Sequence, residues 1–132
     1  MQPWKLTDVS LVVKGRDLDP DRISERLGLM PTSVRPPGPS RWEPAGETDG
    51  RWRLQCDEHT SRSFADQLDN LLGVVEEKQD RLAALAGDGF EVFISVHGFA
   101  TNDSNLLFTH GQLLRMSRLH IPLTLIPNLN DR

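Results

Sequence analysis

The sequence has one cysteine, no tyrosine and no long run of apolar residues. A lone Cys56 excludes an internal disulfide framework and a multi-cysteine zinc site, and is ordinary in a reducing compartment. A membrane-spanning helix needs about 20 apolar residues, and no stretch approaches that length. Residues 1–5 are not followed by the apolar run of a secretory signal. We therefore expect a cytoplasmic protein with no membrane partner.

An excess of positive charge is also missing. The sequence contains fifteen Lys and Arg residues and nineteen Asp and Glu residues, which gives a net charge of −4. Non-specific nucleic-acid binding requires a basic footprint, so we expect no nucleic-acid partner. No glycine-rich phosphate loop and no G-x-S-x-G turn occurs. Cys56 and His59 have C-x-x-H spacing, but a zinc site needs more ligands than this pair, so we expect no metal and no cofactor.

What is present is typical of a globular domain: 37% of the 132 residues are hydrophobic and 26% are charged. We expect residues 1–132 to form a single domain. Apolar alternation predicts strands over 9–13, 51–56, 90–99 and 122–126, the last at a sheet edge. Helical spacing and capping signals predict helices over 20–27, 63–87 and 109–119. Five prolines within 31–50 predict a loop without regular structure.

This order of elements predicts an α+β fold, a two-layer sandwich. The sheet should be mostly antiparallel with four or five strands, and the helices should cover one face. A ferredoxin-like arrangement is one version of such a fold. A doubly wound parallel sheet is disfavoured because its strands read as continuously apolar.

Two short phrases carry a resemblance to a known family. Gly15 to Pro20 reads G-x-x-L-D-P, and Leu27 to Thr32 reads L-G-L-x-P-T. In these phrases, and in the order of elements over nearly the whole chain, the sequence resembles a bacterial family known as domain of unknown function 4279. The resemblance implies the same fold. It implies no activity, because both phrases describe a strand end, a capped helix and a turn.

The helices leave one face of the predicted sheet open. Its expected lining mixes apolar, charged and polar side chains: Ser10, Val12, Lys14, Arg51, Arg53, Gln55, Glu91, Phe93, Ser95, His97, Thr124 and Ile126. Such a face is too apolar for plain solvent surface and too polar for a core. Our leading hypothesis is therefore a non-enzymatic binding module. It would form a homodimer or hold a protein partner through this face, with Phe93 in the contact.

The alternative is a small protein that binds an anionic ligand, or a small enzyme. Arg41, Trp42, Arg51, Trp52 and Arg53, with Arg35 nearby, could hold an anion by bidentate hydrogen bonds and cation–π contacts. His97 would be the acid or base, oriented by Asp103. In a purely structural interpretation Trp52 belongs to the core, Trp42 folds the loop onto the sheet, and His97 is a surface histidine.

Overall fold

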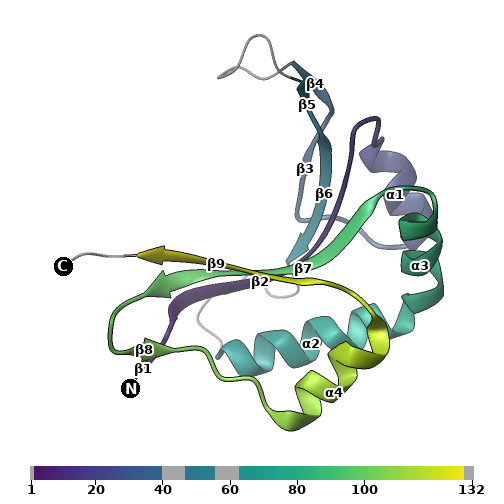
Figure 1. Ribbon diagram of the computed structural model, residues 1–132. Helices are drawn as coiled ribbons and strands as arrows, with labels where there is room; N and C mark the ends of the chain where they lie inside the picture. The colour runs from purple at the N-terminus through teal and green to yellow at the C-terminus, as the bar shows by residue number, and fades with distance from the viewer. Residues whose placement is uncertain (1, 40–46, 56–62, 130–132) are drawn as a thin grey trace.

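The computed structural model describes residues 2–39, 47–55 and 63–129, and it has two layers. One layer is a five-stranded sheet and the other consists of helices that cover a single face of it (Figure 1). The strand order is β3 (Ser33–Arg35), β6 (Gly50–Gln55), β2 (Lys5–Gly15), β7 (Glu91–Ala100) and β9 (Leu123–Leu129). The predicted α+β sandwich is confirmed, and β9 lies at an edge as expected.

The sheet is mostly antiparallel. The pairs β3–β6, β6–β2 and β2–β7 are antiparallel, whereas β7 and β9 are parallel and joined through α4 (His110–Leu119). A ferredoxin-like fold splits its parallel pairs with another strand. Here β7 and β9 are direct neighbours, so the chain adopts a different arrangement.

The predicted capping residues lie at both ends of α1 and at the start of α4. Helix α1 (Pro20–Leu27) starts at Asp19, whose side chain accepts a hydrogen bond from the backbone N–H of Asp21. It ends at Gly28, whose φ of 67° is the left-handed conformation that glycine adopts without strain. Helix α4 starts with a reciprocal capping box between Thr109 and Gln112.

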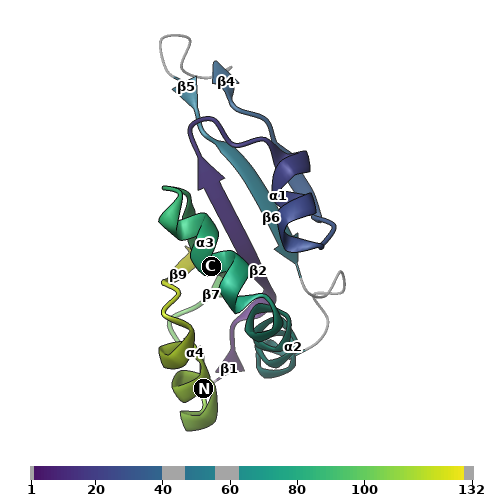
Figure 2. The same cartoon turned by 90° about the vertical axis from the view of Figure 1, so that its right-hand side faces the viewer.

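The long helix predicted over 63–87 is two helices. Helix α2 (Phe64–Glu77) ends and α3 (Gln79–Gly87) begins at Lys78, where φ is −107° and ψ is 14°. The two axes diverge there, and α3 runs toward the start of β7 (Figure 2). The sequence did not show this break because the apolar spacing continues across it, so that α3 still buries Leu82 and Leu85.

The prediction that 31–50 lacks regular structure is wrong in part. The segment contains β3 and a short antiparallel pair, β4 (Gly38–Pro39) with β5 (Glu47–Thr48). Pro31 and Pro36 lie on either side of β3 and do not interrupt it, and β3 is an edge strand, where a missing N–H donor is tolerated. Pro39 lies within the short strand β4. A further short parallel pair joins β1 (Gln2–Pro3) to β8 (Ser104–Asn105).

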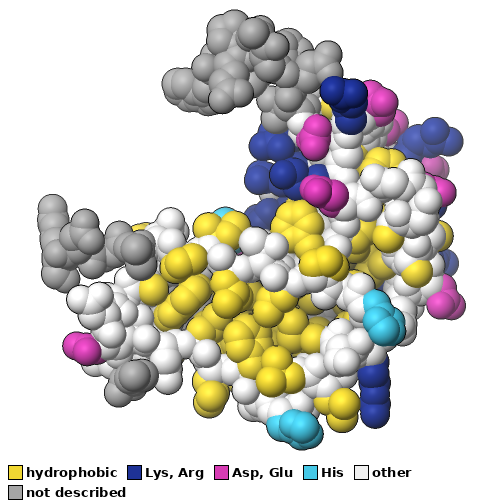
Figure 3. Space-filling model, viewed as in Figure 1, with side chains coloured by type: hydrophobic (Ala, Val, Ile, Leu, Met, Phe, Trp, Pro, Cys, Tyr) yellow, Lys and Arg dark blue, Asp and Glu magenta, His cyan; other side chains and the backbone are white. Residues whose placement is uncertain are grey.

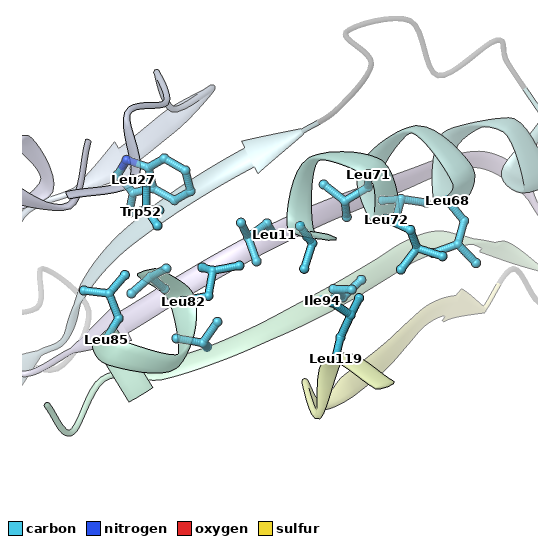
Figure 4. Packing of buried hydrophobic residues seen from close by; sticks show 14 of the residues in the cluster. Leu11, Leu27, Trp52, Leu68, Leu71, Leu72, Leu82, Leu85, Ile94 and Leu119 are labelled. Atoms are coloured by element: carbon cyan, nitrogen blue, oxygen red, sulfur yellow. The ribbon is translucent and has the colours of Figure 1, made fainter. Parts of the chain in front are cut away.

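The core lies between the sheet and the helices (Figure 4). Leu11, Trp52 and Ile94 enter it from three neighbouring strands and are at most 1% exposed. The indole N–H of Trp52 donates to Ser24 Oγ at 3.0 Å, so the one polar group of this large side chain is satisfied. Full burial of an apolar side chain contributes roughly 1.5–3 kcal/mol, so this layer supplies most of the stability.

Candidate functional site

The open face of the sheet is hollowed. The helices lie on the other face (Figures 1 and 2), and the hollow encloses about 530 Å³. Its lining comes from β2, β6, β7 and β9: Asp8, Val12, Lys14, Arg51, Arg53, Phe93, Ser95, His97, Gly98, Phe99, Ile126 and Asn128. Alternate residues of each strand point to this face, as the period of two requires.

Three cations lie side by side on this face, and we call them the basic row: Arg35, Arg51 and Lys14. They are register partners on β3, β6 and β2, and Glu91 of β7 follows Lys14 at the end of the row. Adjacent strands are about 4.8 Å apart, so the backbones of the three cations span about 10 Å. In Figure 3, dark blue Lys and Arg side chains gather beside β3 and β6, on the side of these strands toward β9.

The cations of the basic row have little to neutralise them. Arg35 donates from Nε to the backbone carbonyl of Asp49 at 3.1 Å. Within the described residues, the side chains of Arg51 and Lys14 have no hydrogen bond or ion pair. Burial lowers the pKa of Arg51, and the positive charges of Arg35 and Arg53 lower it further.

Arg53 lies on the same strand face but is neutralised. Its guanidinium forms an ion pair with Asp8, and both side chains are about one-fifth exposed. Asp8 also accepts a hydrogen bond from Ser10 Oγ at 2.7 Å. Ser10, although it belongs to the open face, is fully buried beside this network. Arg51 and Arg53 therefore differ in charge environment although they are two residues apart.

Apolar side chains occupy the half of the face toward β9. Val12 is buried and Phe93 is half-buried, whereas Ile126 is 37% and Phe99 is 44% exposed. A larger hollow of about 860 Å³ lies between α3 and the start of β9, and it shares Lys14, Phe93 and Ile126 with the first. The two hollows thus adjoin over the apolar part of the face.

The structure does not join His97 to Asp103. His97 is half-buried on the open face, and its register partners are Asp8 and Ile126. Asp103 lies in the turn beyond the end of β7, at least three strand residues away, which is about 10 Å along the chain. Within the described residues no hydrogen bond links the two, and Asp8, the acid nearest in register, is engaged by Arg53.

The other predicted site residues are divided between the two faces. Trp52 is fully buried in the core, so the structure corrects its assignment as a contact residue and agrees with the structural interpretation. Arg51, Arg53, Phe93 and His97 lie on the open face. Arg41, Trp42, Cys56 and His59 fall outside the described residues.

Sequence reasoning missed Asp8, Ser33 and Phe99. The predicted strand began at residue 9, whereas β2 begins at Lys5, so Asp8 was not placed on the face. Ser33 lies on β3, inside the segment interpreted as a loop. The sequence contained the pattern that places two of them. Asp8, Ser10 and Val12 are alternate residues of one strand, and Ser33 alternates with the apolar Val34.

Fold and surface together define an α+β sandwich with one covered face and one open face that is basic and apolar. The family model described as Domain of unknown function (DUF4279) matches residues 4–130, so the chain belongs to this family. No curated protein and no solved structure matches it. Among the described residues, no helix is long and apolar enough to cross a membrane, and no group of three His, Cys, Asp or Glu could hold a metal ion.

Proposed function

We propose that the protein is a non-enzymatic, cytoplasmic binding module that holds an acidic, partly apolar segment of another protein on its open sheet face. The observation that carries this proposal is the composition of the hollow. Lys14 and Arg51, which form no ion pair with any described residue, lie beside half-exposed apolar side chains on one concave surface. Protein interfaces combine such apolar anchors with charged groups that select the partner.

The apolar part would supply the anchor. Phe93 lies where the two hollows adjoin, with Ile126 beside it in both linings. An aromatic side chain near the centre of an interface is the kind of residue that carries most of the binding energy. The continuity of the hollows suits an extended segment rather than a compact small molecule.

The charge of the face favours an acidic partner over a second copy of this chain. A twofold dimer through this face would bring two basic rows into one interface. Arg51 is already crowded by Arg35 and Arg53, so further positive charge would raise the cost. The chain as a whole is acidic, with a net charge of −4, which sets the basic row apart from the rest of the molecule.

A binding role is also supported by the surroundings of His97. The enzymatic alternative needs a carboxylate that orients this imidazole. In the described part of the chain, Asp103 lies beyond the end of β7 and makes no hydrogen bond with His97. The nearest acid in register, Asp8, binds Arg53 and Ser10 instead.

Fluorescence anisotropy with synthetic peptides tests the proposal. The probe is a short labelled peptide of alternating glutamate and leucine, and the comparison peptide replaces glutamate by lysine. We expect the acidic peptide to bind and the basic one not to bind. Phe93→Glu should abolish binding. The matched control is Leu113→Glu, which makes the same kind of change on α4, where Leu113 is 50% exposed, and should leave binding unchanged.

Two results would overturn the proposal. Equal binding of both peptides, or equal loss in both variants, would show that the open face does not select an acidic segment. A stable dimer in light scattering that Phe93→Glu converts to a monomer would assign the face to a second copy instead.

A further inference from the structure

We infer that the basic row of Arg35, Arg51 and Lys14 is a binding site for one oxyanion group, a carboxylate or a phosphate, with Arg51 as its central donor. This inference rests on the proposed function and deepens it, because the row would hold the acidic group of the bound segment. It assigns a particular place and chemistry to the charge contact.

The register places the three cations around one point. Arg51 is flanked by Arg35 on one neighbouring strand and by Lys14 on the other. An arginine presents five N–H donors in a planar fork that matches two oxygens of one anion, and lysine adds a point charge. The hydrogen bond from Arg35 Nε to the backbone carbonyl of Asp49 holds the arginine side chain. The two terminal amino groups of Arg35 make no hydrogen bond with a described residue.

Two polar atoms at this end of the face are buried and lack a partner within the described residues. They are Arg51 Nε on β6 and Ser33 Oγ on β3; the direct register partner of Ser33 is Arg53, two residues from Arg51. Buried polar atoms are almost always hydrogen-bonded, so an unsatisfied pair needs an explanation. The lowered pKa of Arg51 shows that its charge is held at a cost in this protein. A bound oxyanion would remove that cost by bringing a negative charge to the row.

Arg53 shows what a satisfied arginine on this face is like. Asp8 occupies its guanidinium, and Gln55 Oε1 lies 3.4 Å from the same amino group. No described acid does this for Arg51. Glu91 closes the row beyond Lys14 but is exposed and forms no ion pair with Lys14 in the described part of the chain. We therefore place the proposed anion at Arg51, between Arg35 and Lys14.

Isothermal titration calorimetry with inorganic phosphate, and separately with citrate, tests the site at constant ionic strength. We expect saturable binding to the wild-type protein. Arg51→Gln should weaken it at least about tenfold, because charge-assisted hydrogen bonds are lost. The matched control is Arg22→Gln, an exposed arginine on α1 outside the open face, which should bind like wild type. Circular dichroism of each variant verifies that it is folded.

The same variants in the peptide assay separate this inference from the proposed function. If the acidic peptide binds to Arg51→Gln as to wild type and no Arg51-dependent anion binding is found, the oxyanion site is wrong and the proposed function stands. If phosphate or citrate binds through Arg51 but no peptide binds, the site is correct, its ligand is a free small anion, and the proposed function fails. If only the peptide binds, and only with Arg51 present, the oxyanion is a carboxylate of the partner protein. Equal anion binding to Arg51→Gln and Arg22→Gln overturns the inference.

Discussion

The two faces of the sheet are built from alternate residues of the same strands, yet their surroundings differ. Trp52 and Arg51 are neighbours on β6: Trp52 is fully buried against the helices, whereas Arg51 lies in the open hollow. On the covered face, Trp52 and its neighbours on β2 and β7 are buried in the core, so substitutions there should act on folding. On the open face the side chains of Arg51 and Lys14 form no described hydrogen bond or ion pair, so substitutions of these two residues should act on binding rather than on folding. If the proposed function is correct, neighbouring residues of one strand serve stability and recognition in turn.

A second contrast lies within the open face. Arg53 has a carboxylate and Arg51 has none among the described residues. An arginine with its own acid belongs to the architecture of the sheet. Arg51 has no such acid among the described residues, and we propose that a bound anion supplies the negative charge. This difference, rather than the number of arginines, is the reason why we propose the site at Arg51.

The largest difference between the two faces is expected in the stabilities of the variants Trp52→Ala and Arg51→Ala. Loss of a fully buried tryptophan should lower the free energy of unfolding by about 3–5 kcal/mol. Arg51→Ala should lower it by about 1 kcal/mol or less, because it removes packing of a partly buried side chain but no described hydrogen bond or ion pair, and it relieves repulsion. Urea denaturation followed by circular dichroism measures both. Similar losses in the two variants would mean that the open face is part of the core.

Asp8→Asn tests whether the carboxylate of Asp8 is what distinguishes Arg53 from Arg51. The substitution removes the acid that binds Arg53, so the free energy of unfolding should fall by about 1–2 kcal/mol. The same change leaves the face more positive, so phosphate should bind more tightly in calorimetry. Asp103→Asn, at an exposed turn, serves as the control and should alter neither quantity. Unchanged stability in Asp8→Asn would show that the Asp8–Arg53 pair is not structural.

Gly73→Ala tests the outer surface of the helix layer, which belongs neither to the core nor to the proposed binding site. A Cβ at Gly73 of α2 meets no atom within 4 Å, so only helix propensity changes. The variant should gain about 1 kcal/mol, which is about 3 °C in melting temperature for a domain of this size. Gly28→Ala should lose stability instead, because its φ of 67° disfavours a side chain. Calorimetry that showed the same sign for both would contradict this assignment.

The smallest effect is expected at Glu76, also on the outer surface. Arg115 donates to Glu76 at 2.5 Å and lowers the pKa of this exposed carboxyl. A carboxyl with a lowered pKa stabilises the fold above its unfolded pKa, and this contribution is lost as the pH falls through the folded pKa. Glu76→Gln should therefore cost less than about 0.5 kcal/mol near neutral pH and nothing in acid. Denaturation curves at two pH values check this; a loss that persists in acid would rule out the ion pair as its cause.

Much of the covered face could be predicted from the sequence. The caps at Asp19 and Thr109 and the alternation of β7 depend on residues close in the chain, and the structure has them as expected. Elements whose existence depends on distant partners were missed. Strand β3 forms because β6 offers it a free edge, and the break at Lys78 has no local apolar signal.

The candidate site divides in the same way. Alternation alone put Arg51, Arg53, Phe93 and His97 on one face, because side chains of a strand point to its two faces in turn. Alternation says nothing about which strands are neighbours. Only the pairing of β3 with β6 placed Arg35 beside Arg51, and only the register of β2 brought Asp8 within reach of Arg53.

The chemistry of near neighbours in the chain therefore decided which residues form helices and strands, and which side of each strand is apolar. The tertiary structure decided which of the charges on the open face are neutralised. The physical reason is range: caps and alternation act within a few residues, whereas ion pairs form between strands that the chain separates by tens of residues. Asp8 and Arg53 meet across such a separation, and Arg51 meets no described acid.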